Sequence, residues 1–171
     1  AIVSGLRERD RTGRGLLLDV SMAGAALQLM YPLTCEAMTD GVVPVRAGNQ
    51  AHSGSPAGDI FPTRDGGAIA FAANTPAQFL RLLDVLGIPE IAHDPTLFEN
   101  PVTPARGGFL RARDAAAIKG RLRAATLQHD GADLETALAA VSVPASRVRT
   151  LPQFTREMSD AGALRPVVLA G

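Results

Sequence analysis

Apolar positions follow two different spacings along the chain, one typical of strands and one typical of helices. Residues 16–20 are apolar almost throughout, which predicts a strand that is buried on both faces. Two short predicted strands, 59–61 and 68–72, are mostly apolar and flank an Asp-Gly pair that tolerates positive φ, so we expect a β-hairpin. Apolar residues spaced three and four apart predict helices at 22–30, 76–86, 111–125 and 132–141.

Capping residues mark where several of these helices begin and end. Thr75 followed by Pro76 is a hydroxyl cap with proline at the first helical position, and Gly87 follows the last turn. Ser21 is expected to cap the helix that follows it, and Thr150 a short last helix. These signals support the helical assignments independently of the hydrophobic spacing.

The first part of the chain arranges its elements in an informative order. A helix over 1–11 is followed by a glycine turn at 12–15, the strand at 16–20 and the helix at 22–30. This order is a piece of a doubly wound α/β layer. Three elements cannot close such a layer, so we expect partner elements outside the ends of the chain. The stretch 31–46 is predicted to connect this layer to a smaller domain.

Composition excludes several classes of protein. The chain has 171 residues, enough for a real core, and 46% of them are hydrophobic, but only 4% are aromatic and none is Trp. The 17 basic and 17 acidic residues cancel, so no strong field attracts nucleic acid or an anionic membrane. No apolar run approaches the roughly 20 residues that span a bilayer. We therefore expect no nucleic-acid partner and no membrane partner.

Cysteine and histidine give little sign of metal or thiol chemistry. The single cysteine, Cys35, rules out an internal disulfide, which fits a cytoplasmic location. No histidine lies near it in the sequence, so we expect a passive packed residue rather than a nucleophile. His93 and His129 have no ligand spacing and are predicted to lie on the surface. No metal site is expected.

The stretch 47–58, ahead of the hairpin, is the candidate binding segment. It consists almost entirely of Gly, Ala, Ser, Pro and short polar residues, with His52 as its one ring. Such a composition lets the backbone approach a bound molecule closely, because no large side chain intervenes. The alternative is a flexible surface loop followed by an ordinary hairpin.

Several motifs resemble one known family. The string GNQ-x-H at 48–52, followed by FPTRDGGAIAFAAN, resembles the family III CoA-transferases, which include formyl-CoA and carnitine CoA-transferases and are related to α-methylacyl-CoA racemases. The segments ERDRTGRG, DVSM, LGIPEIAHDPTLFEN, VPASRV and RTLPQF match further motifs of this family in the same order. The chain departs from the pattern at Leu16, where Gln is usual, and at Gly24, where Asp is common. The stretch 101–108 is also longer than usual.

The resemblance implies a division into domains. Residues 1–38 correspond to the end of the first part of a large, doubly wound Rossmann-like domain, and 39–46 to a linker. Residues 47–158 correspond to a small α+β domain. Residues 159–171 would return to the large domain, with a strand predicted over 161–168. The chain would thus be an internal fragment of an α/β enzyme that forms an interlocked homodimer.

The resemblance also implies a reaction. Family members move CoA from an acyl-CoA to a carboxylic acid through an aspartyl anhydride and an aspartyl-CoA thioester, with CoA as substrate and no cofactor. The nucleophilic aspartate is expected N-terminal to Ala1, so no catalytic residue is assigned here. Gly48, Asn49, Gln50 and His52 are expected to face the substrate, with His52 donating a hydrogen bond to a carboxylate.

Two other functions stay open. Racemase relatives carry a carboxylate in the segment that corresponds to 61–63, where this chain has none, and Asp59 falls too early. The chain can also be a truncated or partner subunit without catalysis, and the isolated chain is expected to be inactive. The charged face of the helix at 111–125 is predicted to be solvated, with a surface for a CoA phosphate as the alternative.

Overall fold

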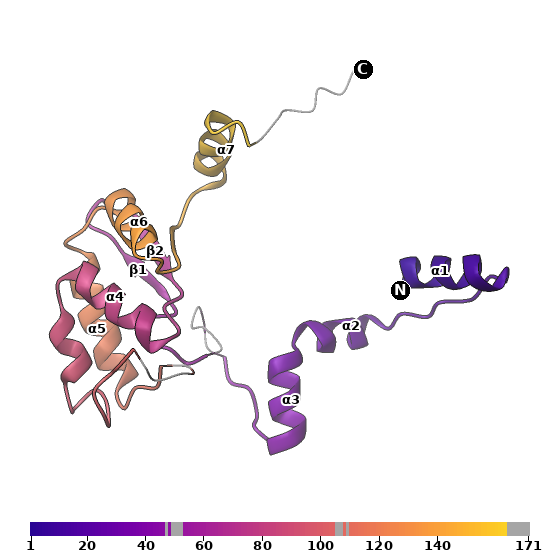
Figure 1. Ribbon diagram of the computed structural model, residues 1–171, viewed down its shortest axis with the longest axis horizontal. Helices are drawn as coiled ribbons and strands as arrows, with labels where there is room; N and C mark the ends of the chain where they lie inside the picture. Colours follow the sequence, from indigo (N-terminus) through magenta and orange to yellow (C-terminus); the bar gives the residue numbers. More distant parts are fainter. Residues whose placement is uncertain (47, 49–52, 105–107, 109, 164–171) are drawn as a thin grey trace. The chain divides into compact units, whose positions relative to one another are not determined.

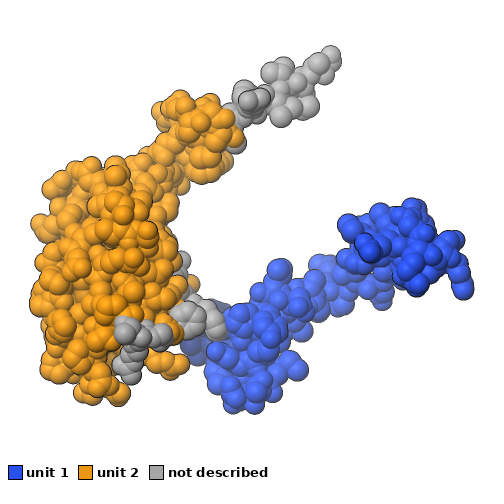
Figure 2. Space-filling model, viewed as in Figure 1, with its two compact units in different colours: residues 1–46 blue, residues 47–171 orange. Residues whose placement is uncertain are grey.

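The computed structural model describes residues 1–46, 48, 53–104, 108 and 110–163. It divides into two compact units, unit 1 over 1–46 and unit 2 over 47–171, which Figure 2 colours blue and orange. The mixed α/β class predicted from the sequence is confirmed. The finer division at residues 38, 46 and 158 stays a prediction.

Unit 1 consists of three helices whose ends follow the capping signals. Helix α1 spans Ile2–Thr12 and ends at Gly13, which has a φ of 70°. Helix α2 spans Met22–Leu29, and the Ser21 hydroxyl accepts a hydrogen bond from the Gly24 N–H at 3.2 Å. Helix α3 spans Tyr31–Asp40. The helices predicted over 1–11 and 22–30, and the cap at Ser21, are therefore confirmed.

Two predictions for unit 1 are wrong. Residues 16–20 are not a strand, because an extended chain needs neighbouring strands for its hydrogen bonds and none of the described strands lies in unit 1. The stretch 31–46 is not a plain connector, because its first ten residues form α3. Pro32 lies in the first turn of α3, where proline is favourable, and so does not interrupt the helix.

Unit 1 has no hydrophobic core of its own within the described residues. No hydrophobic side chain before Ala57 is among the buried ones, and Leu17, Met22 and Leu29 are each about nine-tenths exposed. Cys35 is exposed as well, so the expectation of a packed cysteine is wrong. A short run of three helices without a sheet offers nothing for these side chains to pack against.

Unit 2 is built on a small antiparallel sheet (Figure 1). Strands β1 (Ile60–Pro62) and β2 (Ala68–Phe71) form the predicted hairpin, and β3 (Ala145–Arg147) pairs with the other edge of β2. Ile69, at the centre of β2, is opposite Phe61 on one side and Arg147 on the other. Its side chain is fully buried.

The described helices of unit 2 are α4 (Pro76–Leu86), the short 3-10 helix η1 (Pro89–His93), α5 (Ala115–Thr126), α6 (Gly131–Ala140) and α7 (Leu151–Asp160). Two of them, α5 and α6, pack against the sheet. Helix α5 contacts β1, α6 contacts β2 and β3, and α4 contacts both of these helices (Figure 1). The fully buried side chains of this core include Ile69, Phe79, Leu82, Ile118, Leu122 and Leu138.

Most helix ends in unit 2 follow the predicted caps. Thr75 and Gln78 form a capping box at the start of α4, and Gly87 ends it with a φ of 71°. Thr150 caps α7. Helix α5 begins four residues later than predicted because Asp114 is its cap and accepts from the Ala117 N–H at 2.9 Å. A strand was predicted over 161–168. Residues 161–163 do not form a strand, and residues 164–168 lie outside the described residues.

The hairpin turn is fastened to the start of α6. The Asp65 carboxylate accepts hydrogen bonds from the Gly67 N–H within the turn and from the Gly131 N–H at the first residue of α6, at 3.2–3.3 Å. Beside it, Arg64 forms a two-pronged ion pair with Asp130, at 2.7 and 3.0 Å. The Arg-Asp-Gly-Gly sequence thus closes the hairpin and also caps a helix that is far away in the chain.

A cluster of four charged residues joins α6, β3 and α7. The Glu135 carboxylate accepts from the two terminal guanidinium nitrogens of Arg149, at 2.7 and 2.9 Å, and from the Arg147 backbone N–H at 3.0 Å. Glu157 on α7 accepts from the same two arginines. The hydrogen bonds from Arg149 lower the pKa of Glu135 to about 2. Partial burial of the carboxylate raises the pKa, and the hydrogen bonds from Arg147 lower it further.

The Glu135→Gln variant tests this cluster. Because the folded pKa of Glu135 lies below its ordinary value of 4.5, the ionised carboxylate stabilises the fold above that pH and the effect is lost as the pH falls toward 2. Allowing for solvent screening, we expect Glu135→Gln to lower the free energy of unfolding by about 1–2 kcal/mol at pH 7. Urea denaturation followed by circular dichroism measures it, with Glu90→Gln as the control. A loss that is the same at low and neutral pH would contradict the argument.

Candidate functional site

The predicted substrate loop lies only partly within the described residues. Gly48 is described: it is exposed, and its φ of 61° is one that favours glycine. Asn49, Gln50 and His52 lie outside the described residues, so their roles stay predictions. The structure does describe the stem that follows them, residues 53–58, and how it is held.

Two serines anchor this stem to the residues that follow β2. The Ser53 hydroxyl donates to the Asn74 side-chain oxygen at 2.7 Å, and the Ser55 hydroxyl donates to the Ala73 carbonyl at 2.9 Å. Ser55 is fully buried, and the Ala57 N–H donates back to its hydroxyl at 3.3 Å. The residues after His52 are therefore fixed against the sheet.

Asn74 is the centre of this arrangement. Its side chain accepts from Ser53, its N–H donates to the Gln78 side chain at 3.2 Å, and its carbonyl accepts from the Leu110 N–H at 2.8 Å. One half-buried residue thus joins the loop stem, the first turn of α4 and the segment before α5. Asn74 ends one of the motifs that carry the family resemblance, but this role could not be predicted from the sequence, since Ser53 and Leu110 lie far from it in the chain.

An ion pair closes the other end of the stem. The Lys119 ammonium of α5 donates to the Asp59 carboxylate at 2.6 Å, and both side chains are about three-quarters buried. Burial raises the pKa of Asp59, but the hydrogen bonds from Lys119 and the Ile60 N–H, with the charges of Lys119 and Arg123, outweigh it and hold the pKa below its usual value. Lys119 belongs to the charged face of the helix predicted at 111–125. That face was predicted to be solvated, and for Lys119 this prediction is wrong.

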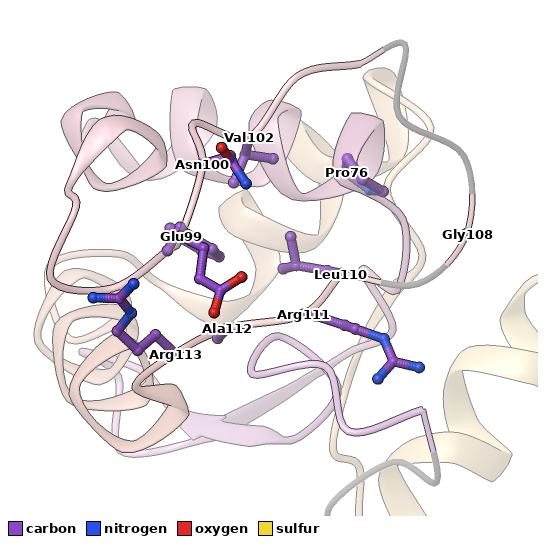
Figure 3. A pocket seen from close by; sticks show the side chains of 10 residues that line it. Pro76, Glu99, Asn100, Val102, Gly108, Leu110, Arg111, Ala112 and Arg113 are labelled. Carbon is purple, nitrogen blue, oxygen red and sulfur yellow. The ribbon is translucent and has the colours of Figure 1, made fainter.

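A pocket lies in the part of unit 2 between η1 and α5 (Figure 3). Its volume is about 650 Å³. The buried side chains of Phe98, Val102 and Leu110 contribute apolar surface, and Glu99, Arg111 and Arg113 contribute charge; the last three are exposed. Leu110 joins the pocket to the loop stem, because its N–H is the donor to the Asn74 carbonyl.

Within the described ranges, no group of three or more His, Cys, Asp or Glu residues is placed to hold a metal ion. His93 is exposed and His129 is half-buried. The His129 carbonyl accepts from the Arg64 N–H at 2.9 Å, which is a structural contact. Among the helices that the structure describes, none is both long and apolar enough to cross a bilayer.

Comparison with protein families identifies one match. The model of CoA-transferase family III matches residues 1–167. This range includes both units and the loop, the stem and the pocket described above.

Two curated relatives have related activities. The succinyl-CoA–D-citramalate CoA-transferase of Chloroflexus aurantiacus is 29% identical over 94% of this chain and 39% of its own length. The acetyl-CoA:oxalate CoA-transferase of Acetobacter aceti is 38% identical over 65% of this chain and 28% of its own length. The chain thus spans well under half the length of these relatives.

Solved structures agree with the fold. A CaiB/BaiF family protein from Brucella suis superposes with a TM-score of 0.65 at 27% identity, covering 94% of this chain and 40% of that one. The protein Rv3272 of Mycobacterium tuberculosis superposes with a TM-score of 0.69 at 18% identity, covering 95% of this chain and 39% of that one, and supports the fold alone.

The Asn74→Ala variant tests how the stem is anchored. It removes the acceptor of the Ser53 hydroxyl but keeps the two backbone hydrogen bonds of residue 74. One hydrogen bond contributes about 0.5–1.5 kcal/mol, so we expect amide exchange in residues 53–58 to accelerate about three- to tenfold. Hydrogen–deuterium exchange read by mass spectrometry measures this change.

Matched variants separate the hydrogen bond from a general loss of packing. Asn74→Asp keeps an oxygen acceptor and should restore slow exchange, whereas Ser53→Ala should match Asn74→Ala. The exposed Asn100 provides the control Asn100→Ala. Exchange in Asn74→Asp that is as fast as in Asn74→Ala would show that this hydrogen bond does not hold the stem.

Proposed function

The chain belongs to CoA-transferase family III, and from this we propose that it is a section of an acyl-CoA:carboxylate CoA-transferase. The observation that carries the proposal is the family match over residues 1–167, together with relatives that are named as transferases of CoA to D-citramalate and oxalate. The proposed substrates are an acyl-CoA and a carboxylic acid. CoA is itself a substrate, and no cofactor is proposed.

In each step of the proposed reaction, an attacking group displaces a leaving group at a carbonyl carbon. An aspartate carboxylate attacks the thioester carbonyl of the donor, which gives a mixed anhydride and a CoA thiolate. The thiolate attacks the aspartyl carbonyl, releases the donor acid and leaves an aspartyl-CoA thioester. The acceptor carboxylate then attacks the aspartyl-CoA thioester, which gives a second anhydride and a CoA thiolate. The thiolate finally attacks the acceptor carbonyl of this anhydride and regenerates the aspartate. We propose that this aspartate lies outside the 171 residues.

The loop at 48–52 would supply the oxyanion donors. Each exchange passes through a tetrahedral intermediate whose oxygen carries negative charge, and backbone N–H groups stabilise such an oxygen well when water is excluded. Gly48, Asn49, Gln50 and His52 are the residues that we propose for this role. The anchored stem supports the proposal, because donors must be held in place before the charge develops.

Local chemistry favours transfer over racemisation. A racemase must remove an α-proton, which requires a base of suitable pKa. Asp59 is paired with Lys119 and has a lowered pKa, and the Asp65 carboxylate accepts hydrogen bonds from Thr63, Gly67 and Gly131. Both carboxylates near β1 are thus committed to structural contacts, which makes them poor bases.

Assembly and location are part of the same proposal. The exposed apolar side chains of unit 1 are those that association with further polypeptide would cover, and we propose an interlocked homodimer for the complete protein.

A cytoplasmic location fits the absence of a disulfide and the supply of acyl-CoA. The alternative is a truncated or partner subunit without catalysis.

Activity assays test the proposal. The complete gene product, incubated with succinyl-CoA and oxalate, glutarate or D-citramalate, should form the acceptor CoA thioester, which liquid chromatography detects. Trapping with hydroxylamine followed by mass spectrometry should place the adduct on an aspartate. The 171-residue chain alone should show no transfer.

Other outcomes would contradict this assignment. Epimerisation of a 2-methylacyl-CoA without transfer to any acid would favour the racemase. Transfer by the 171-residue chain alone, lost when one of its own residues is changed, would show that the nucleophile lies within it. No thioester chemistry from the complete gene product would favour the non-catalytic subunit.

A further inference from the structure

Helix α7 is attached to unit 2 in a different way from the other long helices. None of its residues is buried, and its apolar side chains Leu151 and Phe154 are 73% and 45% exposed. Helices α4, α5 and α6 each bury apolar side chains in the core. Burial of an apolar face stabilises most helices in proteins, and α7 has no such burial within unit 2.

The side chain that joins α7 to the rest of unit 2 is Glu157. Its carboxylate accepts hydrogen bonds from the guanidinium groups of Arg147 and Arg149, at 3.0 and 2.5 Å. The side-chain hydrogen bonds of Gln153, Thr155 and Arg156 stay within the helix and its cap. Among the described residues, one carboxylate thus makes the polar contact between α7 and another element.

The two arginines are held in place without Glu157. The Glu135 carboxylate of α6 accepts from both terminal nitrogens of Arg149 and from Nε of Arg147. The side chains of Glu135 and Arg149 are 23% and 20% exposed, whereas Glu157 is 45% exposed. Loss of the Glu157 contact therefore leaves both arginines paired with Glu135, and water solvates the released carboxylate.

Water and salt reach the Glu157 contact from the side. A polar pocket of about 280 Å³ lies between the hairpin turn and α7, and Gly67, Gln153 and Glu157 are among its lining residues. Residues 148–150, which lead into α7, form neither strand nor helix. The helix is thus joined to unit 2 by a short irregular link and by ion pairs that salt can screen.

We propose that α7 is a hinged arm, held on unit 2 by the ion pairs of Glu157 with Arg147 and Arg149. Salt releases this arm while the sheet and helices α4–α6 stay folded. A helix as short as α7 is marginal by itself in water, so its backbone hydrogen bonds open more often once it is released. The proposal does not depend on the transfer reaction, since none of these residues is among those proposed to face the substrate.

Hydrogen–deuterium exchange of the full 171-residue chain, read by mass spectrometry, tests the arm. The exchange is measured at ionic strengths of about 0.01 M and about 1 M, where the Debye length is about 30 Å and about 3 Å. We expect exchange in residues 151–160 to accelerate about three- to tenfold at high salt. Exchange in α4, which is held by buried Phe79 and Leu82, should not change. Equal acceleration in both helices, or an α7 that is unprotected at both ionic strengths, would overturn the proposal.

Two matched variants separate the ion pairs from effects on the helix alone. Glu157→Ala should show the fast exchange of α7 already at low salt and should no longer respond to salt. Asp160→Ala removes the same charge from the last turn, at an exposed residue without an ion pair among the described residues, and should not accelerate exchange.

The direction of the change is what distinguishes the two explanations. Alanine favours a helix, and a negative charge near the C-terminus disfavours one, so an effect on the helix alone would slow exchange in both variants. The ion pairs predict acceleration in Glu157→Ala only. Exchange in Glu157→Ala that is as slow as in the unchanged chain, or that depends on salt to the same extent, would contradict the proposal.

Discussion

The hydrogen bonds of Asn74 hold together the parts of unit 2 that matter for function. One residue at the end of β2 accepts from Ser53, donates to Gln78 and accepts from Leu110. Asn74 lies between β2 and α4, so it fixes two segments that have little regular structure against two that are regular. Ser53 belongs to the stem that follows the proposed substrate loop, and Leu110 lines the pocket between η1 and α5. Small-residue segments need such anchors, because they carry few side chains that pack.

How much the sequence could predict depended on the distance between interacting residues. The hairpin and the caps at Thr75 and Thr150 were predicted correctly, because each depends on residues within a few positions of one another. The strand at 16–20 was wrong, because a strand exists only with partners that its own sequence does not specify. The contacts of Asn74 with Ser53 and of Lys119 with Asp59 join residues 21 and 60 positions apart, and no local pattern reveals them.

Unit 2 buries most of its large apolar side chains, whereas unit 1 leaves them exposed. In unit 2, α5 and α6 pack against the sheet and α4 packs against both of these helices, so that Phe79, Ile118 and Leu138 are fully enclosed. Unit 1 has helices of similar length but no described strand, and its apolar residues stay exposed. The apolar run at 16–20 has the composition of a buried strand without a sheet to join. This composition is what the proposed association with further polypeptide would explain.

The arginines of unit 2 differ in whether the fold uses their charge. Arg64, Arg147 and Arg149 each bind carboxylates that cap or connect elements, so their charges are already neutralised by the fold. Arg111 and Arg113, like Arg81, Arg123 and Arg156, are exposed and form no ion pair with a described residue. Water solvates an exposed guanidinium group at little cost, so an unpaired arginine on the surface does not by itself mark a binding site. The paired arginines are the ones that the fold depends on, because each joins elements that are far apart in the chain.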